Sequence, residues 1–576
     1  MPWRGRPRAT PSRTSISTSR LVLRLLRQRL AHLRSILGRG QGARRTIFAG
    51  FVLVFGAVMV AEYAVFRRAL FTIGELGAAS AALTLYFLES VMVLIFVLAL
   101  LSFVASGLWV YYRARDTRLL LAAPIPLGGL YALRSVETFT LTSWPLGVVG
   151  LPALLALGAA YRQDPGFYAY GAVVLTCFAA LTGAGGALVT TAAGAALRRA
   201  PSRLVVAVTV AVLLVAFIAL VGRNLVPSAV DFHVMFEPGT LNGKPASIKF
   251  IEGKFALWPS HPFAAALYTR ATGGPAGSAA TGWALWLAPL GALLGAATLG
   301  RRLYGRTLPA MAESFGPAAA AAPSPRAAAS GFPRWLSGPI GALIERDLIA
   351  IARSPHELGR AAFIALLLLL YTSFIVIAPL REVADRPEAV ARLLLFSVIA
   401  SGYFITAFGL RFVFPSLSLE GRVAWVFFSS PVSAFRLVMA RAALYVSVLS
   451  VVVVPIAMIG VVRLVREPGL VATMAALLLL LAATTATLLL AFGAAWPDFR
   501  EPNPETLSTS GGGLAGTVIC LLYVAGMGWI ARQAALASTG GGSMVTWLAM
   551  GAVASVALIT GALGLARWRL RTLEAR

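Results

Sequence analysis

Few residues in this 576-residue chain have side chains suited to catalysis or metal binding at neutral pH. No histidine lies at metal-ligand spacing from another, and each of the two cysteines, Cys177 and Cys520, falls inside an apolar run. We therefore expect neither a metal site nor a disulfide framework. The motifs GxxxxGK[ST] and HExxH do not occur, because the Gly-Lys pairs at 243–244 and 253–254 are followed by proline and phenylalanine. The sequence thus predicts no P-loop, no catalytic residue, no cofactor bound by this chain and no enzymatic activity of its own.

Two carboxylates, Glu89 and Glu137, lie within apolar runs. An ionisable residue inside a membrane segment marks a functional site by default. Glu137 follows Arg134 by three residues, which favours an i, i+3 ion pair. Glu89 has no partner that the sequence reveals, and it either borders a polar cavity or reaches the outer interface. His261, between a serine and a proline, is expected to be a loop residue.

The composition indicates a membrane protein. The chain is 58% hydrophobic and 12% charged, with a mean hydropathy of +0.81, whereas soluble domains carry about 25% charged residues. Its formal charge of +28 fits an excess of arginine on the cytoplasmic side of a bilayer. Nucleic-acid binding would need a basic soluble domain, which the sequence does not contain. We expect an all-α polytopic protein whose partner is the lipid bilayer, and no nucleic-acid partner.

Twelve apolar runs are long enough to span a bilayer, at about 20 residues each. They lie at 46–66, 82–112, 130–160, 167–197, 202–222, 281–303, 361–380, 389–412, 435–462, 469–495, 514–534 and 544–566. This pattern predicts two six-helix repeats with amphipathic interfacial helices. The expected first units are a basic cytoplasmic tail with an amphipathic helix at 1–45 and a first half at 46–303 with an outside loop at 224–280. A flexible linker at 304–339 and a second half at 340–576 follow.

The distribution of charge predicts the topology. With the N-terminus inside, most of the 50 basic residues fall on the inner side, so we expect a cytoplasmic (inner) membrane protein with both termini cytoplasmic. In the outside loop, Asn242-Gly243 is a strong hairpin signal and 258–271 is expected to be a short helix on the outer face.

Two polar turns occupy matching places in the two halves. The stretch 411–441 lies between the second and third apolar runs of the second half, and Ser430-Pro431 reads as a helix start. The stretch 111–137 lies at the same place in the first half. Pro124 and Arg134 have the same separation as Pro431 and Arg441. Because both turns fall on the predicted cytoplasmic side, we interpret them as a pair of docking surfaces; the alternative is turns held only by lipid headgroups.

Three stretches resemble a known family. They are LIERDLIAIARSP at 343–355, PSLSLEGRVAWVFFSSPVSAFRLVMAR at 415–441 and PDFREPNPETLSTSGGGL at 497–514. They are similar to bacterial ABC transporter permeases of the type 2 export class, here in a two-half, twelve-span form. The resemblance covers 340–566 well and 46–303 thinly, and the first half has ARDTR in place of LEGR.

The resemblance implies a membrane-spanning permease subunit of an ATP-driven exporter, paired with a separate ABC ATPase in two copies. It also implies that the cytoplasmic turns dock on that ATPase. The residues expected at these ATPase-coupling turns are Arg115, Asp116, Arg118, Pro124, Arg134, Glu420, Gly421, Arg422, Phe427, Phe428, Pro431, Ser433 and Arg436.

Two other functions remain open at this point. A twelve-span secondary active transporter would need buried titratable residues, of which the sequence offers only Glu89 and Glu137. A non-transporting membrane scaffold or sensor would use 224–280 as its outside reader.

Overall fold

The computed structural model describes most of the chain, and the structural findings are confined to that part. It comprises residues 42–75, 79–112, 117–122, 126–199, 240–241, 244–274, 276, 278–314, 341, 344–347, 368, 387–425, 429, 433–501, 504–508, 510–540 and 542–574.

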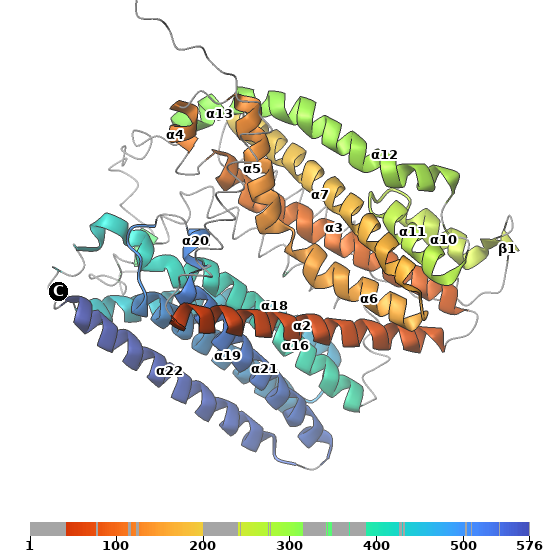
Figure 1. Cartoon of the computed structure of the whole chain (residues 1–576). Helices are drawn as coiled ribbons and strands as arrows, with labels where there is room; N and C mark the ends of the chain where they lie inside the picture. Colours follow the sequence, from red (N-terminus) through yellow and green to blue (C-terminus); the bar gives the residue numbers. More distant parts are fainter. Residues whose placement is uncertain are drawn as a thin grey trace, which may run out of the picture.

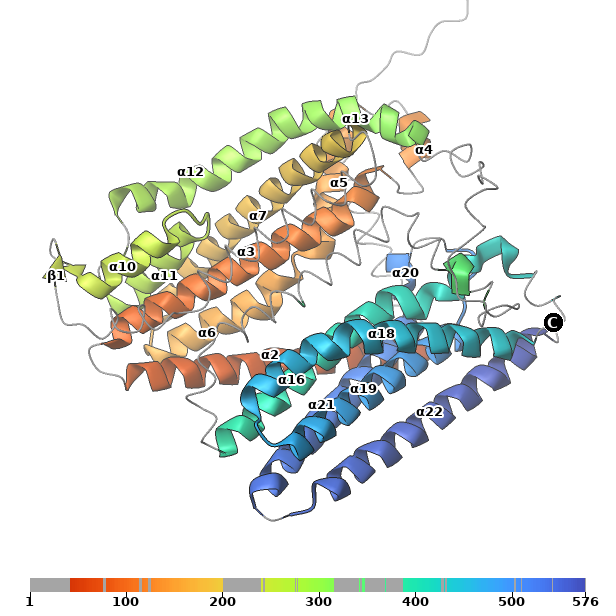
Figure 2. The same cartoon turned by 180° about the vertical axis from the view of Figure 1, so that it is seen from behind.

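Long helices of the first half form one bundle (Figures 1 and 2). In lipid, a helix satisfies every backbone hydrogen bond internally, so long apolar runs fold this way. The helices of this half are α2 (Gly42–Gly74), α3 (Ser80–Tyr112), α4 (Thr117–Ala122), α5 (Leu127–Thr142), α6 (Leu151–Ala160), α7 (Pro165–Arg199), α12 (Ala279–Gly295) and α13 (Arg301–Ser314), with π-helical turns η2 (Leu146–Gly150) and η3 (Ala296–Gly300).

One predicted span of the first half is broken. The run at 130–160 forms α5 and then η2 with α6, and the two parts are bent by 47°. Pro145 lies at the break, where it has no N–H to donate to the preceding turn. The π-helical turn η2 follows Pro145 directly. π-Helical geometry occurs mostly as single turns that interrupt an α-helix.

A small outer cap follows α7 in the chain. Strands β1 (Thr240–Leu241) and β2 (Lys244–Pro245) pair antiparallel on either side of residues 242 and 243, as the hairpin signal predicted. Helices α10 (Ala246–Phe255) and α11 (His261–Thr272) come next and pack against α3 (Figure 1). Helix α11 is the predicted short helix, but its apolar face is buried in the core.

The second half forms a second bundle around one central helix. Its elements are α16 (Pro387–Phe408), η6 (Gly409–Val413), η7 (Phe414–Ser416), η8 (Ser418–Val423), α18 (Ala434–Leu464), α19 (Pro468–Ala495), α20 (Pro504–Ser508), α21 (Gly511–Thr539) and α22 (Met544–Glu574). Helix α19 packs against α16, α18, α21 and α22, and it is the most buried of the candidate spans.

A close backbone approach joins α19 to the end of the α16 segment. A Cβ at Gly493 would come within 2.1 Å of the Phe414 carbonyl oxygen. Glycine is therefore required here, because any side chain would push η7 away from α19. This contact holds the polar turn that begins at η7 against the centre of the second bundle.

Helix α2 contacts both halves. It packs against α6 of the first bundle and against α21 of the second (Figures 1 and 2). Its carboxylate Glu62 acts electrostatically on the Tyr403 hydroxyl of α16. The first long helix of the chain thus lies at the seam between the halves.

The described residues contain eight helices that are long and apolar enough to cross a membrane, or nine if the bent α5–α6 pair is one span. This agrees with an all-α membrane protein. Twelve spans and two repeats are not confirmed: α2 is not among the eight, 202–222 lies outside the described residues, and of 361–380 only Leu368 is described.

Several predicted boundaries differ from the structure. Gly511 begins α21, with Ser510 as its N-cap, so this helix starts three residues before the predicted run at 514–534. Helix α18 begins at Ala434. Helix α13 continues to Ser314, so the first part of the predicted linker is helical. The amphipathic helix predicted at 20–37 lies outside the described residues.

Candidate functional site

Four charged residues from three segments form an ion cluster in the second half. They are Arg346 and Asp347, in the helical residues 344–347, Glu420 of η8 and Arg441 of α18. Arg441 donates from Nε to Asp347 Oδ2 at 3.0 Å and from Nη2 to Glu420 Oε1. Arg346 donates from Nη2 to Asp347 Oδ1 at 2.7 Å and from Nη1 to Glu420 Oε2 at 3.1 Å. Each arginine therefore bridges both carboxylates.

Backbone geometry brings Glu420 to this cluster. The chain leaves α16 through the π-helical η6 and the 3₁₀ turns η7 and η8, which turn it back toward α18. Gly421 has φ +55° and ψ −130°, a conformation in which only glycine is unstrained. Arg441 also donates from Nη1 to the Ser416 carbonyl at 3.1 Å, so one guanidinium holds both ends of this turn.

The cluster is balanced and mostly buried. Two guanidinium groups face two carboxylates, so their charges sum to zero. Arg441 is 5% exposed, whereas the Arg346 side chain is 45% exposed. Burial lowers the pKa of the Arg346 guanidinium, but hydrogen bonds to Glu420 and Asp347 raise it further, so the pKa lies above its ordinary value. A buried charge needs such partners, because an unpaired one is strongly destabilising.

A simpler version of this arrangement occurs in the first half. Arg134 of α5 is 1% exposed and donates from Nη1 to Glu137 Oε2 at 2.7 Å, the pair that the sequence predicted. Its Nη2 donates to the Thr117 hydroxyl of α4 at 3.0 Å. Arg134 therefore connects α5 to the turn before α5, and Arg441 connects α18 to the turn before α18. The sequence alignment placed these two arginines at the same position.

The other residues predicted for the coupling turns lie outside the ion cluster or outside the described residues. Ser433 and Arg436 lie at the start of α18 with exposed side chains, and neither is among the four residues of the ion cluster. The predicted residues outside the described part are Arg115, Asp116, Pro124, Phe427, Phe428 and Pro431, and the side chains of Arg118 and Arg422 lie outside it as well.

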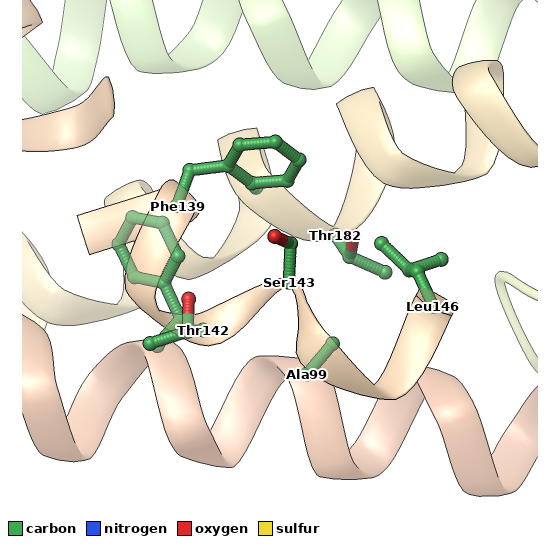
Figure 3. A pocket seen from close by; sticks show the side chains of 8 residues that line it. Ala99, Phe139, Thr142, Ser143, Leu146 and Thr182 are labelled. Atoms are coloured by element: carbon green, nitrogen blue, oxygen red, sulfur yellow. The ribbon is translucent and has the colours of Figure 1, made fainter. Parts of the chain in front are cut away.

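The hollow at the helix break has no charged lining. It is too small to hold a water molecule and is lined by Ala99, Phe103, Phe139, Thr142, Ser143, Leu146, Thr182 and Gly183. Figure 3 shows these side chains converging from α3, α5, η2 and α7. The hydroxyls of Thr142 and Thr182 bond to carbonyls of their own helices. The hollow is therefore an apolar packing defect, and we assign it no chemistry.

Glu89 has a partner that the sequence did not reveal. Its Oε1 lies 2.6 Å from Nδ1 of His261, which is 172 positions away in α11. Glu89 is fully buried, and His261 begins a helix instead of lying in a loop. Among the described residues, no three His, Cys, Asp or Glu side chains are placed to hold a metal ion.

Comparison with known families gives one match. Residues 42–563 match the sequence model of a family described as a putative ATP-binding cassette. The match covers nearly the whole described region, including both bundles and the ion cluster. The chain belongs to this family. No curated protein and no solved structure shows a match to it.

Membership of the putative ATP-binding cassette family overturns four predictions. The family is described by ATP binding and not as a permease, so the assignment to the type 2 export permeases is wrong, as is the function of a permease-only subunit. For the same reason, the predictions of no ATPase function and of no cofactor bound by this chain are wrong. A separate ATPase partner has no support. The two predictions about ATP rested on the missing P-loop. Any ATP site in this chain has to use another arrangement.

Sequence reasoning also missed partners that are distant along the chain. Asp347 and Arg346 were interpreted as charges of a surface helix, yet they complete the cluster with Glu420 and Arg441. The one available signal was the acidic-basic pair itself, in a segment just before a spanning run. Glu62, inside the first apolar run, was also missed, although an ionisable residue in such a run is a signal by itself.

Proposed function

We propose that this chain is an integral membrane component of an ATP-binding cassette transport assembly. In this proposal it lies in the cytoplasmic membrane with both termini inside, and its twelve spans form two six-helix repeats. An ATP-dependent step reaches the spanning helices through the ion cluster of Arg346, Asp347, Glu420 and Arg441. The excess of basic residues on the predicted inner side and the eight apolar helices support this placement.

The observation that carries the proposal is the way the cluster joins three segments at one end of a long span. Arg441 lies in the apolar helix of the candidate span Val438–Leu464. Through Asp347 and Glu420 it is bonded to residues 344–347 and to η8. A displacement of η8 is therefore transmitted to α18 and, through Gly493, to α19. A rigid connection of this kind is what a rocking motion of packed helices requires.

The first half supports the same interpretation. Arg134 links α5 to α4 by one hydrogen bond, to Thr117, while its ion pair with Glu137 lies within α5, so it offers a second and weaker connection. Two connections of unequal strength fit a pair of halves that respond unequally to the ATP-dependent step.

ATP binding by this chain is part of the proposal and follows from the family description. Phosphate groups are recognised by bidentate arginine, and this chain has no lysine outside 244–254. We therefore propose that arginine side chains and backbone N–H groups contact the nucleotide, in place of a P-loop.

A distance measurement tests the role of the cluster. Spin labels at Arg302→Cys in α13 and Arg436→Cys in α18, on a Cys177→Ser/Cys520→Ala background, report the separation of the halves in lipid nanodiscs. We expect ATP to shift the distance distribution and Glu420→Gln to abolish the shift, because a neutral amide releases Arg441 from η8.

The matched control is Glu388→Gln, which removes a carboxylate from an exposed pair on α16 and leaves the cluster intact. It should leave the ATP-dependent shift unchanged. The proposal fails if ATP shifts the distance distribution as much in Glu420→Gln as in the control. It also fails if ATP causes no shift in the parent chain.

A further inference from the structure

The outer cap is joined to α3 by a buried ionisable pair. Glu89 is 0% exposed and His261 is 7% exposed, and their contact is the 2.6 Å bond between Oε1 and Nδ1. Glu89 lies in the third turn of α3, and His261 is the first residue of α11. The pair thus connects a membrane-spanning helix to a short helix of the cap (Figure 1).

Apolar side chains exclude water from this pair. Ile248, Ile251 and Phe255 of α10 and Phe263 of α11 are fully buried in the same core, and the Phe263 ring lies 5.0 Å from that of Phe178. Glu89 Oε2 and the Ser260 hydroxyl are buried without a hydrogen-bond partner. Such a site is costly unless its charge is balanced.

Among the described residues, α10 carries charged groups near the pair. On α10, Glu252 acts electrostatically on Glu89, while Lys254 donates to the Tyr86 hydroxyl at 3.3 Å and lies over the Tyr86 ring. On α11, Arg270 pairs with Asp164 at the opposite end of the helix.

The other helices that pack on α11 add no charge at the pair. Helix α12 carries no charged residue, and α7 carries only Arg198 and Arg199, about 30 Å along the helix from Phe178. The hydroxyls of Tyr161, directly after α6, and Tyr268, in α11, act electrostatically on each other.

Charge balance depends on one shared proton. A carboxylate and a neutral imidazole together carry one negative charge. One further proton, bound by either group, brings the net charge of the pair to zero. Loss of that proton leaves a buried carboxylate uncompensated, beside the negative charge of Glu252. Gain of a second proton leaves a buried imidazolium, which Glu252 partly offsets. The pair titrates as a unit, and loss of the proton is the more costly change.

We propose that Glu89 and His261 form a proton-binding site that fastens the cap of α10 and α11 to α3. With the proton bound, the cap is held closed. When the pH rises and the proton leaves, the buried negative charge loosens α10 and α11 from α3. The proton stabilises the closed cap, so this stability is present at low pH and is lost as the pH rises.

Hydrogen exchange measured by mass spectrometry on the full chain in nanodiscs tests this site. After correction for intrinsic rates, peptides covering 246–272 should exchange at least tenfold faster at pH 9.5 than at pH 6. Peptides from the buried helix α19 serve as the internal reference. In Glu89→Gln/His261→Gln the neutral side chains keep a hydrogen bond without titrating, so the protection should no longer depend on pH.

Arg270→Gln is the control, because it removes an exposed charge pair from the same helix. It should retain the pH dependence of the parent chain. The proposal is overturned if the parent chain shows no pH dependence over 246–272, or if the double variant keeps it. The pH dependence of exchange over 246–272 is measured on the parent chain itself. The site can therefore be tested even if the double variant does not fold.

Discussion

Replacing Arg441 with leucine is expected to destabilise the protein by about 3–5 kcal/mol, because it leaves Asp347 and Glu420 side by side without their buried cation. Both carboxylates are only 10% exposed at the side chain. The loss also frees the Ser416 carbonyl of η7 from its donor, and η8 loses the bond between Glu420 and α18. The free energy of unfolding in mixed micelles, measured by denaturant titration, reports this change.

Arg346→Leu is the matched control for Arg441→Leu. It removes the second guanidinium of the same cluster, but that side chain is 45% exposed. An exposed ion pair contributes about 0–1 kcal/mol, so the destabilisation should stay within that range. Equal costs for the two variants would show that burial of Arg441 does not govern the cluster.

Replacing Arg134 with leucine is expected to cost a similar amount, about 3–5 kcal/mol, because it leaves Glu137 in a largely buried place without its cation. Glu137 is 15% exposed at the side chain, and Thr117 loses its donor in the same change. The same unfolding measurement applies.

The double variant Arg134→Leu/Glu137→Leu separates loss of the ion pair from loss of packing. Removing both charges avoids the uncompensated carboxylate, and a buried pair can often be replaced by apolar residues at little cost. The double variant should therefore be more stable than Arg134→Leu alone. If it is no more stable than Arg134→Leu, the uncompensated carboxylate of Glu137 is not what destabilises the single variant.

Local sequence patterns predicted much of the architecture. Apolar length alone located the eight candidate spans, because a bilayer fixes the length of a helix that crosses it. The hairpin at 242–243 and the pair of Arg134 with Glu137 were predictable for the same reason: each is set by residues a few positions apart. Arg134 and Arg441, which the alignment placed at the same position, are both buried arginines that bond to the turn before their own helix.

Contacts between distant segments were not predictable from one sequence. Glu89 and His261 are 172 positions apart, and Asp347 and Arg441 are 94 apart, so no local spacing connects them. The helix start at the glycines 511–513 was not predictable because glycine stops helices more often than it starts them, whereas here Gly513 lies so close to the Ser508 carbonyl that a side chain would clash. The predictions of no cofactor and no ATPase function failed because the absence of a P-loop was treated as the absence of ATP binding.

The most direct test of the proposed function is whether the purified chain binds ATP. A photoreactive ATP analogue is added to the full chain in nanodiscs, with and without excess ATP, and labelled peptides are mapped by mass spectrometry. The account predicts saturable labelling of this chain that ATP prevents. Absence of labelling in a chain whose hydrogen exchange shows it to be folded would contradict the account.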